Sequence, residues 1–356
     1  MRENGDRVGP SIESNNFDAI RLIAALCVLI SHAFPLTYGS DEFEPVYRWS
    51  HGQTTIGTIA VGVFFAISGF LITRSFVHAG RSWGGVSRFV RARVLRLVPA
   101  LLVALLLLAF LFGPLVSSQP IADYFQFPQM VRFILINCSF VSFHDTLPGV
   151  FIHNPFPNSV DGSLWTLRHE VRCYLMIFLL GVAGLLKSPM LIVLYGSSLA
   201  ILFWHGSPIA FLFACFLGGA LIYSNRLPID NRAAVVCLVA LAASAWLGLF
   251  GPAAPIFGSY LVIWLALSDS VRLPRLAKYG DFSYGVYIYA FPVQQLVTQM
   301  MADRATWYWN IAISAPITLI LGIASWFLIE RPALALKRQA KKAEPARSAA
   351  YPAGAD

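Results

Sequence analysis

The sequence has 356 residues, of which 57% are hydrophobic and only 12% are charged. Soluble domains contain about 25% charged and about 45–50% apolar residues, so this composition excludes a soluble globular enzyme, a secreted disulfide scaffold and a disordered chain. The 26 Lys and Arg residues exceed the 18 Asp and Glu residues, and in a membrane protein such an excess more often reflects topology than nucleic-acid binding. The five cysteines form no CxxC pair, so no metal site is expected.

Apolar segments along the chain predict ten transmembrane helices, because a helix of about 20 apolar residues crosses the bilayer core with its backbone hydrogen bonds satisfied. The expected spans are residues 17–37, 56–77, 95–114, 164–186, 189–204, 207–224, 233–250, 253–268, 282–301 and 308–330. Residues 205–208 separate the fifth and sixth spans and predict either a tight hairpin or one broken helix. We therefore expect an all-α polytopic membrane protein.

Lys and Arg residues predict the orientation of these spans. With the N-terminus inside, segments on the inner side hold 20 of the 26 Lys and Arg residues, and the outer segments with their span entrances hold five. Cytoplasmic loops are the ones rich in Lys and Arg, so both termini are expected in the cytoplasm. The expected parts are a cytoplasmic tail over 1–16, a membrane domain over 17–332 and a disordered cytoplasmic tail over 333–356.

The first expected span contains Arg21 and, eleven residues later, His32. Eleven residues correspond to three helical turns plus roughly 20°, so both side chains lie on one helix face. Ionisable residues inside a span are costly unless they are paired or hydrated, and they often mark functional sites. The alternative is that Arg21 pairs structurally with Asp18 or a neighbouring helix and that His32 is an interfacial residue.

The inner segment after the second span is rich in arginine. Arg93 and Arg96 are three residues apart and share a helix face at the membrane surface. Because the planar guanidinium fork matches phosphate oxygens, this pair suits a nucleotide-bearing donor. The alternative is a topology determinant that contacts lipid headgroups. Glu330 ends the last span and is expected near these arginines as a structural partner.

Glu170 lies one to two turns inside the fourth expected span, and Tyr174 follows four residues later on the same helix face. A carboxylate at this position could orient an imidazole or bind a hydroxyl substrate. The alternative is a local pair of Glu170 with Arg168 or Arg172 at a wet helix end.

Short motifs follow one another in a recognisable order along the chain. They are Phe17-Asp18-x-x-Arg21-x-x-Ala24-Ala25 leading to His32, Gly62-Val63-Phe64-Phe65-x-x-Ser68-Gly69-Phe70, Arg93-x-x-Arg96-x-x-Pro99, Ser163-Leu164-Trp165-Thr166-Leu167-x-x-Glu170-x-x-x-Tyr174, Ser283-Tyr284-Gly285-x-Tyr287 and Glu330-Arg331-Pro332. Together they resemble the acyltransferase 3 family of integral membrane O-acyltransferases. One departure is Ala290, which stands where the family often has a histidine.

The resemblance implies an O-acyltransferase of the bacterial cytoplasmic membrane. Its donor would be acyl-CoA, commonly acetyl-CoA, as a substrate rather than a tightly bound cofactor. Its acceptor would be a hydroxyl of a glycan or of another cell-envelope or secondary-metabolite molecule. By resemblance, His32 acts as general base or as an acylated relay, Arg21 positions the donor or stabilises charge at its carbonyl, and Glu170 orients His32 or the acceptor. Arg93 and Arg96 hold the CoA phosphates. Membrane lipid is a further expected partner, and nucleic acid is not.

A transporter or flippase for an acylated lipid or sugar is the alternative, with Arg21 and Glu170 as its intramembrane charges. Secondary transporters often contain internal repeats, and none stands out in this sequence. The basic segment around Arg93 favours the enzyme.

Overall fold

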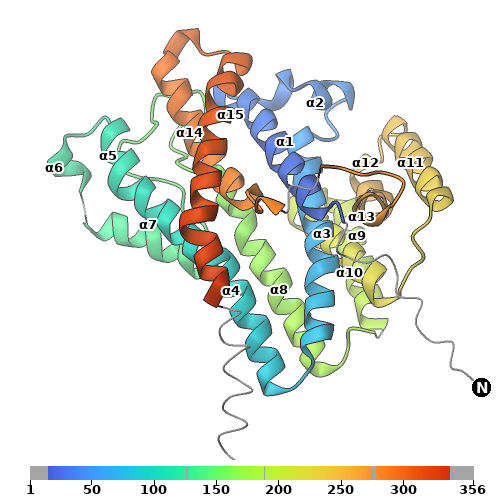
Figure 1. Cartoon of the computed structure of the whole chain (residues 1–356). Helices are drawn as coiled ribbons and strands as arrows, with labels where there is room; N and C mark the ends of the chain where they lie inside the picture. The colour runs from blue at the N-terminus through green and yellow to red at the C-terminus, as the bar shows by residue number, and fades with distance from the viewer. Residues whose placement is uncertain (1–14, 126, 188, 275–277, 337–356) are drawn as a thin grey trace, which may run out of the picture. The chain divides into compact units, whose positions relative to one another are not determined.

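The computed structural model describes residues 15–125, 127–187, 189–274 and 278–336. Within these residues the chain is built of helices, and the β pairing found there is an isolated bridge between Ser117 and Val150. Figure 1 shows the helices with their labels. The predicted all-α class is therefore confirmed.

The longer helices occupy most of the described chain. They are α1 (Phe17–Tyr38), α3 (Ile56–Ala79), α4 (Trp83–Leu107), α7 (Phe127–Ser139), α8 (Trp165–Ala183), α9 (Pro189–His205), α10 (Pro208–Ser224), α11 (Asn231–Trp246), α13 (Ser259–Leu267), α14 (Ser283–Met301) and α15 (Trp307–Ser325). The shorter ones are α2 (Pro45–Trp49), α5 (Gly113–Val116), α6 (Ile121–Tyr124) and α12 (Phe250–Ala253). Each expected span thus contains a helix.

Five helical segments of the described chain are long and apolar enough to cross a membrane by length and composition. They are Phe17–Tyr38, Ile56–Ala79, Trp83–Val116, Phe250–Leu267 and Trp307–Leu336. The apolar helices α9, α10 and α11 are shorter, and α8 carries three charged residues near its start. The protein is an all-α membrane protein, while the count of ten spans and the sides of the termini stay predictions.

Helix α4 begins earlier than expected. The third span was predicted from residue 95, where the apolar run starts, but the helix begins at Trp83. Its N-cap is Ser82, whose hydroxyl accepts a hydrogen bond from the Gly85 amide at 3.2 Å. A Ser cap satisfies one of the free amides of a helix start. The arginines from Arg88 to Arg96 therefore lie in the first turns of α4, ahead of its apolar part.

The chain divides into two compact units that alternate along the sequence. Unit 1 contains Met1–Ser31, Asp41–Arg74 and Ala183–Ser283, and unit 2 contains His32–Ser40, Ser75–Val182 and Tyr284–Asp356. The predicted division into tails and one membrane domain stays a prediction, and residues 1–14 and 337–356 lie outside the described residues.

Unit 1 is held together by close helix packing. A Cβ added at Gly69 of α3 would lie 1.8 Å from the carbonyl oxygen of Phe216. A Cβ added at Gly219 of α10 would lie 2.0 Å from the carbonyl oxygen of Ala66. Small residues let membrane helices approach at their backbones, which explains the Ser68-Gly69 motif. Helices α9 and α10 form a tight hairpin around Gly206, which has a positive φ of 61°, so the broken-helix alternative is wrong.

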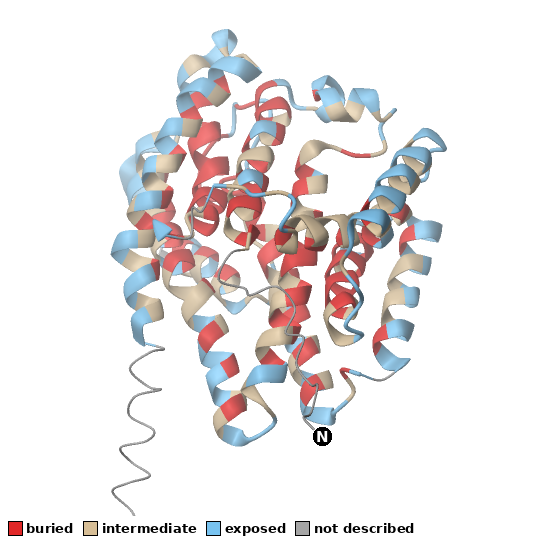
Figure 2. Ribbon diagram, turned by 45° about the vertical axis from the view of Figure 1, so that its right-hand side comes forward, coloured by how far each residue is buried: buried red, intermediate tan, exposed pale blue. Residues whose placement is uncertain are grey.

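Unit 2 is organised around α14, which is buried along most of its length, as the red ribbon in Figure 2 marks. Its Gly285 packs against Gly322 of α15, where an added Cβ would lie 2.8 Å from the opposing Cα. Gln294 of α14 also donates to Asn310 of α15 at 2.9 Å, and Asn310 donates back to the Gln294 carbonyl at 3.0 Å. This buried amide pair fixes how α14 and α15 face each other.

Candidate active site

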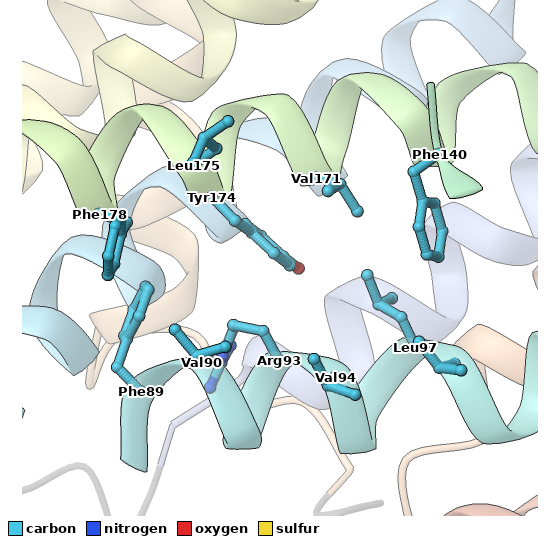
Figure 3. Close-up of a pocket in the computed structure, with 11 residues that line it drawn as sticks. Phe89, Val90, Arg93, Val94, Leu97, Phe140, Val171, Tyr174, Leu175 and Phe178 are labelled. Atoms are coloured by element: carbon cyan, nitrogen blue, oxygen red, sulfur yellow. The ribbon is translucent and has the colours of Figure 1, made fainter. Parts of the chain in front are cut away.

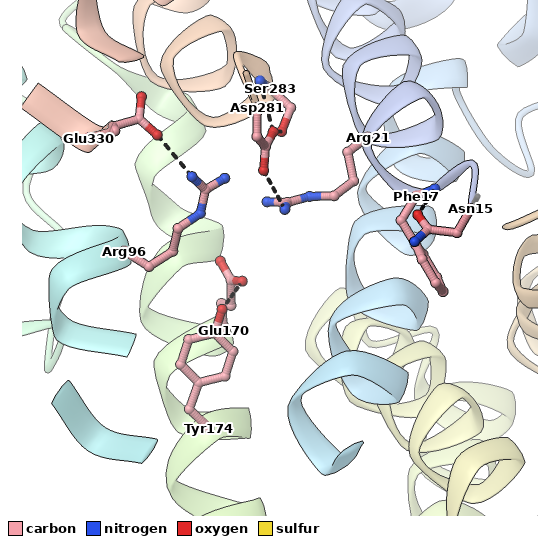
Figure 4. A network of polar contacts seen from close by, with 9 residues as sticks. All are labelled: Asn15, Phe17, Arg21, Arg96, Glu170, Tyr174, Asp281, Ser283 and Glu330. Carbon is pink, nitrogen blue, oxygen red and sulfur yellow. Dashed lines mark hydrogen bonds and ion pairs between the residues drawn. The ribbon is translucent and has the colours of Figure 1, made fainter. Parts of the chain in front are cut away.

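Arg21 lies on α1 in unit 1 and forms an ion pair with Asp281. Its Nη1 is 2.7 Å from Asp281 Oδ2, and the two side chains are 23% and 14% exposed. The other carboxylate oxygen of Asp281 accepts from the Ser283 amide at 3.3 Å, at the start of α14 (Figure 4). A partner outside the first span was one of the alternatives expected for Arg21. Asp281 itself was missed, because nothing in the local pattern links it to a helix 260 residues away.

His32 lies on α1 in unit 2, beside Phe291 of α14. The two rings meet edge-on, with centroids 5.3 Å apart. The Nδ1 atom of His32 is buried and has no hydrogen-bond partner among the described residues. Buried polar atoms are nearly always satisfied, so such an atom needs an explanation. A group that enters the site and shares a proton with Nδ1 would provide one.

Phe291 is held in place from two further sides. It is 4% exposed and packs edge-on against Phe156 at 6.0 Å. It also touches Gly162, where an added Cβ would lie 2.7 Å from the ring. Ala290, the departure from the family motif, is fully buried next to it. The sequence drew attention to Ala290, but it is Phe291 that contacts His32.

Glu170 and Tyr174 form the contact that their spacing predicts. The Tyr174 hydroxyl donates a hydrogen bond to the Glu170 carboxylate on α8 (Figure 4). Arg168 donates to His169 Nε2 at 3.2 Å, and Arg172 donates to the Val141 carbonyl at 3.1 Å. The carboxylate of Glu170 is therefore positioned by an aromatic hydroxyl on its own helix.

Arg96 belongs to a buried cluster in unit 2. Its Nη1 is 3.0 Å from Glu330 Oε2, and Glu330 is 2% exposed. The guanidinium also lies over the ring of Tyr284 at 5.6 Å, and Ser325 donates to Glu330 at 3.1 Å. Glu330 thus lies beside an arginine of α4, as its place at the end of the last span predicts (Figure 4).

Arg93 lies one turn earlier on α4 and has different surroundings. Its guanidinium carbon is 5.9 Å from the ring centroids of both Phe89 and Tyr174. It lines an apolar pocket between α4 and α8, which Figure 3 shows from close by. Of the two arginines predicted to act together, Arg96 pairs with Glu330, and Arg93 lies over the rings of Phe89 and Tyr174.

Asp161 is a buried carboxyl that the motif analysis gave no role. It caps the turn Gly162–Leu164 that leads into α8, and its Oδ1 accepts from the Ser163 amide at 3.1 Å and from the Ser163 hydroxyl at 2.7 Å. Its Oδ2 is buried without a hydrogen-bond partner among the described residues. Burial raises the pKa of Asp161 to about 8, against the lowering effect of the Ser163 hydrogen bonds.

The described residues contain no group of three His, Cys, Asp or Glu side chains placed to hold a metal ion.

A family model described as an acyltransferase domain, that of acyltransferase 3, matches residues 14–331. The "O-acetyl transferase" of Shigella phage Sf6 is 32% identical, over 90% of this chain and 96% of its own length. "Nodulation protein 10" of Rhizobium leguminosarum bv. viciae is 29% identical, over 93% of this chain and 97% of its own length. No solved structure gives a significant match.

Proposed function

The chain belongs to the acyltransferase 3 family, and from that premise we propose that this membrane acyltransferase moves an acetyl group from acetyl-CoA to a hydroxyl of a glycan or another cell-envelope or secondary-metabolite acceptor. The relative from Shigella phage Sf6 is named an O-acetyl transferase, which supports acetyl as the group and oxygen as the accepting atom. The proposed location is the bacterial cytoplasmic membrane.

The observation that carries the proposal is the environment of His32. Its Nδ1 is buried, lacks a hydrogen-bond partner among the described residues and belongs to a ring held by Phe291. An imidazole held in this way is prepared to accept a proton from an entering hydroxyl, which is the task of a general base.

The proposed reaction begins when His32 takes the proton of the acceptor hydroxyl. The acceptor oxygen then forms a bond to the thioester carbonyl carbon, and the carbon–sulfur bond breaks. The proton held by His32 passes to the departing CoA thiolate, so that protons balance over the cycle. In the less favoured variant, His32 itself carries the acyl group between donor and acceptor.

The other site residues have supporting roles in this proposal. Arg21 positions the donor or stabilises the negative charge that develops on the carbonyl oxygen. Arg93 and Arg96 bind the CoA phosphates through charge-assisted hydrogen bonds. Glu170, held by Tyr174, orients His32 or the acceptor hydroxyl.

The test uses the purified full-length protein and acetyl-CoA labelled in its acetyl group. We expect label to move to a polysaccharide or glycolipid acceptor, with release of free CoA in equal amount. A flippase for an acylated lipid or sugar would instead move a labelled substrate across a proteoliposome without releasing CoA. That second result would contradict the acyl-transfer proposal.

A further inference from the structure

Two arginines on one side of α8 lack a carboxylate partner. Arg168 and Arg172 are four residues apart, so their side chains lie on the same side of the helix. Among the described residues, no carboxylate lies within ion-pair distance of either guanidinium. Like charges at this spacing repel each other. The fold therefore holds together two positive charges that it does not neutralise.

His169 lies between the two guanidiniums and is fully buried. The Nε atom of Arg168 donates to its Nε2 at 3.2 Å, and Nη1 of Arg172 lies 3.4 Å from its Nδ1. A neutral imidazole accepts at one nitrogen and carries a proton on the other, while a guanidinium only donates. In either tautomer, one imidazole N–H therefore faces an N–H of an arginine. An oxyanion is the kind of group that accepts hydrogen bonds from both.

The segment that follows α7 restricts both guanidiniums. Nη2 of Arg172 donates to the Val141 carbonyl at 3.1 Å, and the guanidinium carbon of Arg168 lies 5.9 Å from the ring centroid of Phe143. The Nη1 and Nη2 atoms of Arg168 have no hydrogen-bond partner among the described residues. Together these two atoms form the planar fork that matches the oxygens of a carboxylate or a phosphate.

A small cavity lies beside Arg168. Its volume of about 10 Å³ is just large enough for one water-sized group. The polar residues of its lining are Asn137, Ser142 and Arg168. Asn137 also anchors the segment after α7, because its side chain donates to the His144 carbonyl at 2.6 Å and accepts from the His144 amide at 3.2 Å. The space suits one oxygen of an acidic group rather than a sugar ring or a lipid chain.

The cavity is built on the turn that packs against Phe291. Gly162 touches the Phe291 ring, and Leu164 of the same turn lines the cavity. Arg168 follows Leu164 by one helical turn, about 6 Å along the axis at about 1.5 Å per residue. Phe291 in turn packs against His32, and all of these residues belong to unit 2. A molecule whose hydroxyl is at His32 therefore has these arginines available, within the same unit, for an acidic group that it carries.

We propose that Arg168 and Arg172 bind an oxyanion of the acceptor, so that the molecule acetylated by this protein carries a carboxylate or a phosphate. The fork of Arg168 binds the oxygens, Arg172 adds a second positive charge, and His169 holds the two guanidiniums in place. This inference deepens the proposed function and rests on it for the identity of the ligand as the acceptor. Binding of an oxyanion by the arginines does not depend on acetyl transfer.

The test measures binding of glucuronate, glucose phosphate and glucose to the purified full-length protein in neutral detergent, by isothermal titration calorimetry without acetyl-CoA. Wild type should bind glucuronate or glucose phosphate about ten-fold to hundred-fold more tightly than glucose, the range for one charge-assisted hydrogen bond. Arg168→Gln should abolish this preference. Arg168→Lys should keep part of it, since it retains the charge and loses the fork. The preferred acid identifies the group as a carboxylate or a phosphate.

Arg232→Gln is the matched control, because Arg232 is an exposed arginine in the first turn of α11, in unit 1. It should keep the wild-type preference. If Arg168→Gln does not fold, Arg172→Gln tests the same pair through an exposed side chain and should also weaken binding of the acid. Equal binding of the three sugars by wild type, or an unchanged preference in the folded variant, would overturn the proposal.

Titration with phosphatidylglycerol tests another source of the oxyanion, a lipid headgroup. Phosphatidylglycerol binding that Arg168→Gln abolishes, without a preference for either acidic sugar, would assign the arginines to the bilayer surface and overturn the proposal.

Steady-state transfer connects the site with the acceptor. Arg168→Gln should raise the KM for an acidic acceptor about ten-fold to hundred-fold and leave the KM for acetyl-CoA unchanged. An equal rise in the KM for a neutral acceptor would overturn the proposal. Absence of transfer to every acceptor would contradict only the proposed function, since the preference for an acidic sugar is measured without acetyl-CoA.

Discussion

The imidazole of His32 meets the phenyl ring of Phe291 edge-on, with an interplanar angle of 81°. This arrangement is favourable for two aromatic rings, so packing against α14 restricts the plane of the imidazole. The buried Nδ1 of His32 has no hydrogen-bond partner among the described residues. A ring that is fixed by packing and unsatisfied at one nitrogen can bind a hydroxyl without first breaking a hydrogen bond of its own.

The first prediction concerns His32 itself. His32→Ala should lower acetyl transfer by about two to four orders of magnitude, the usual contribution of a general base. Protein abundance and acyl-CoA affinity should stay close to wild type, because the variant removes the base and leaves the donor contacts. The measurement is the rate of transfer from labelled acetyl-CoA at equal amounts of folded protein.

The controls for this prediction are His51→Ala and His205→Ala, which change exposed histidines outside the proposed site. Both should retain transfer close to wild type. If folded His32→Ala kept more than half of the activity, the assignment of His32 as the base would be wrong, and His169 beside Glu170 would become the next candidate.

The second prediction tests whether the packing of Phe291 positions His32. Gly162→Ala adds a Cβ that would lie 2.7 Å from the Phe291 ring, so the ring must move. The turnover number should fall while the KM for acetyl-CoA stays unchanged, and overpacking should cost about 1–3 kcal/mol of stability. Steady-state kinetics and the thermal midpoint measure both effects.

Gly196→Ala is the matched control, because Gly196 lies on α9 with nothing within 4 Å of an added Cβ. It should keep wild-type turnover and gain roughly 0.5–1 kcal/mol from helix propensity. Equal kinetics for the two alanine variants would show that Phe291 does not position His32.

Several parts of the fold could be predicted from the sequence, because they rest on local patterns. Apolar runs predict where helices occur, and the i,i+4 spacing predicts the contact of Glu170 with Tyr174. The start of α4 could not be predicted from hydropathy, because its first turns carry arginines rather than apolar residues. Only the Ser82 cap marks that start.

Contacts between distant segments follow no period and were harder to predict. Glu330 and Arg96 are 234 residues apart, yet their pairing could be anticipated because both were expected at the same membrane face. Asp281, the partner of Arg21, and Phe291, the partner of His32, depend on how α14 packs. The sequence contains no local signal for that packing.

The third prediction separates two roles of Arg21. Arg21→Ala removes the counter-charge from Asp281, 2.7 Å away, and should reduce both stability and transfer. The double variant Arg21→Ala/Asp281→Ala should recover stability, because it removes both the guanidinium and the carboxylate and leaves neither without this partner. It should not recover transfer if Arg21 contacts the donor. The measurement is a double-mutant cycle in thermal midpoint and in acetyl-transfer rate.

Arg21→Lys completes this test, since it keeps the charge and loses the guanidinium fork. We expect it to fold and to transfer poorly. Full recovery of transfer in the double variant would mean that the Arg21–Asp281 pair has a structural role alone.

The fourth prediction concerns the donor. Arg93→Ala and Arg96→Ala should each raise the KM for acetyl-CoA about ten-fold to hundred-fold, and that for the acceptor much less. Arg96→Ala should also destabilise the protein, because it leaves the Glu330 carboxylate, 2% exposed, without this partner. Glu330→Gln in the Arg96→Ala background should relieve the instability and leave the KM raised. Unchanged donor KM in both single variants would return these arginines to a structural or topological role.

The last prediction concerns pH and Asp161. Burial raises the pKa of this carboxyl to about 8, with a smaller raising effect from Asp145 nearby. Because the folded state holds the proton more tightly than the unfolded chain, the stabilisation linked to Asp161 is fully present below about pH 4. It is lost progressively as the pH rises toward about pH 8. The thermal midpoint of wild type should therefore fall over this interval.

Asp161→Asn keeps a neutral side chain whose oxygen can still accept from Ser163, so its midpoint should fall less steeply. Parallel midpoint curves for wild type and Asp161→Asn would show that Asp161 is ionised in the folded protein.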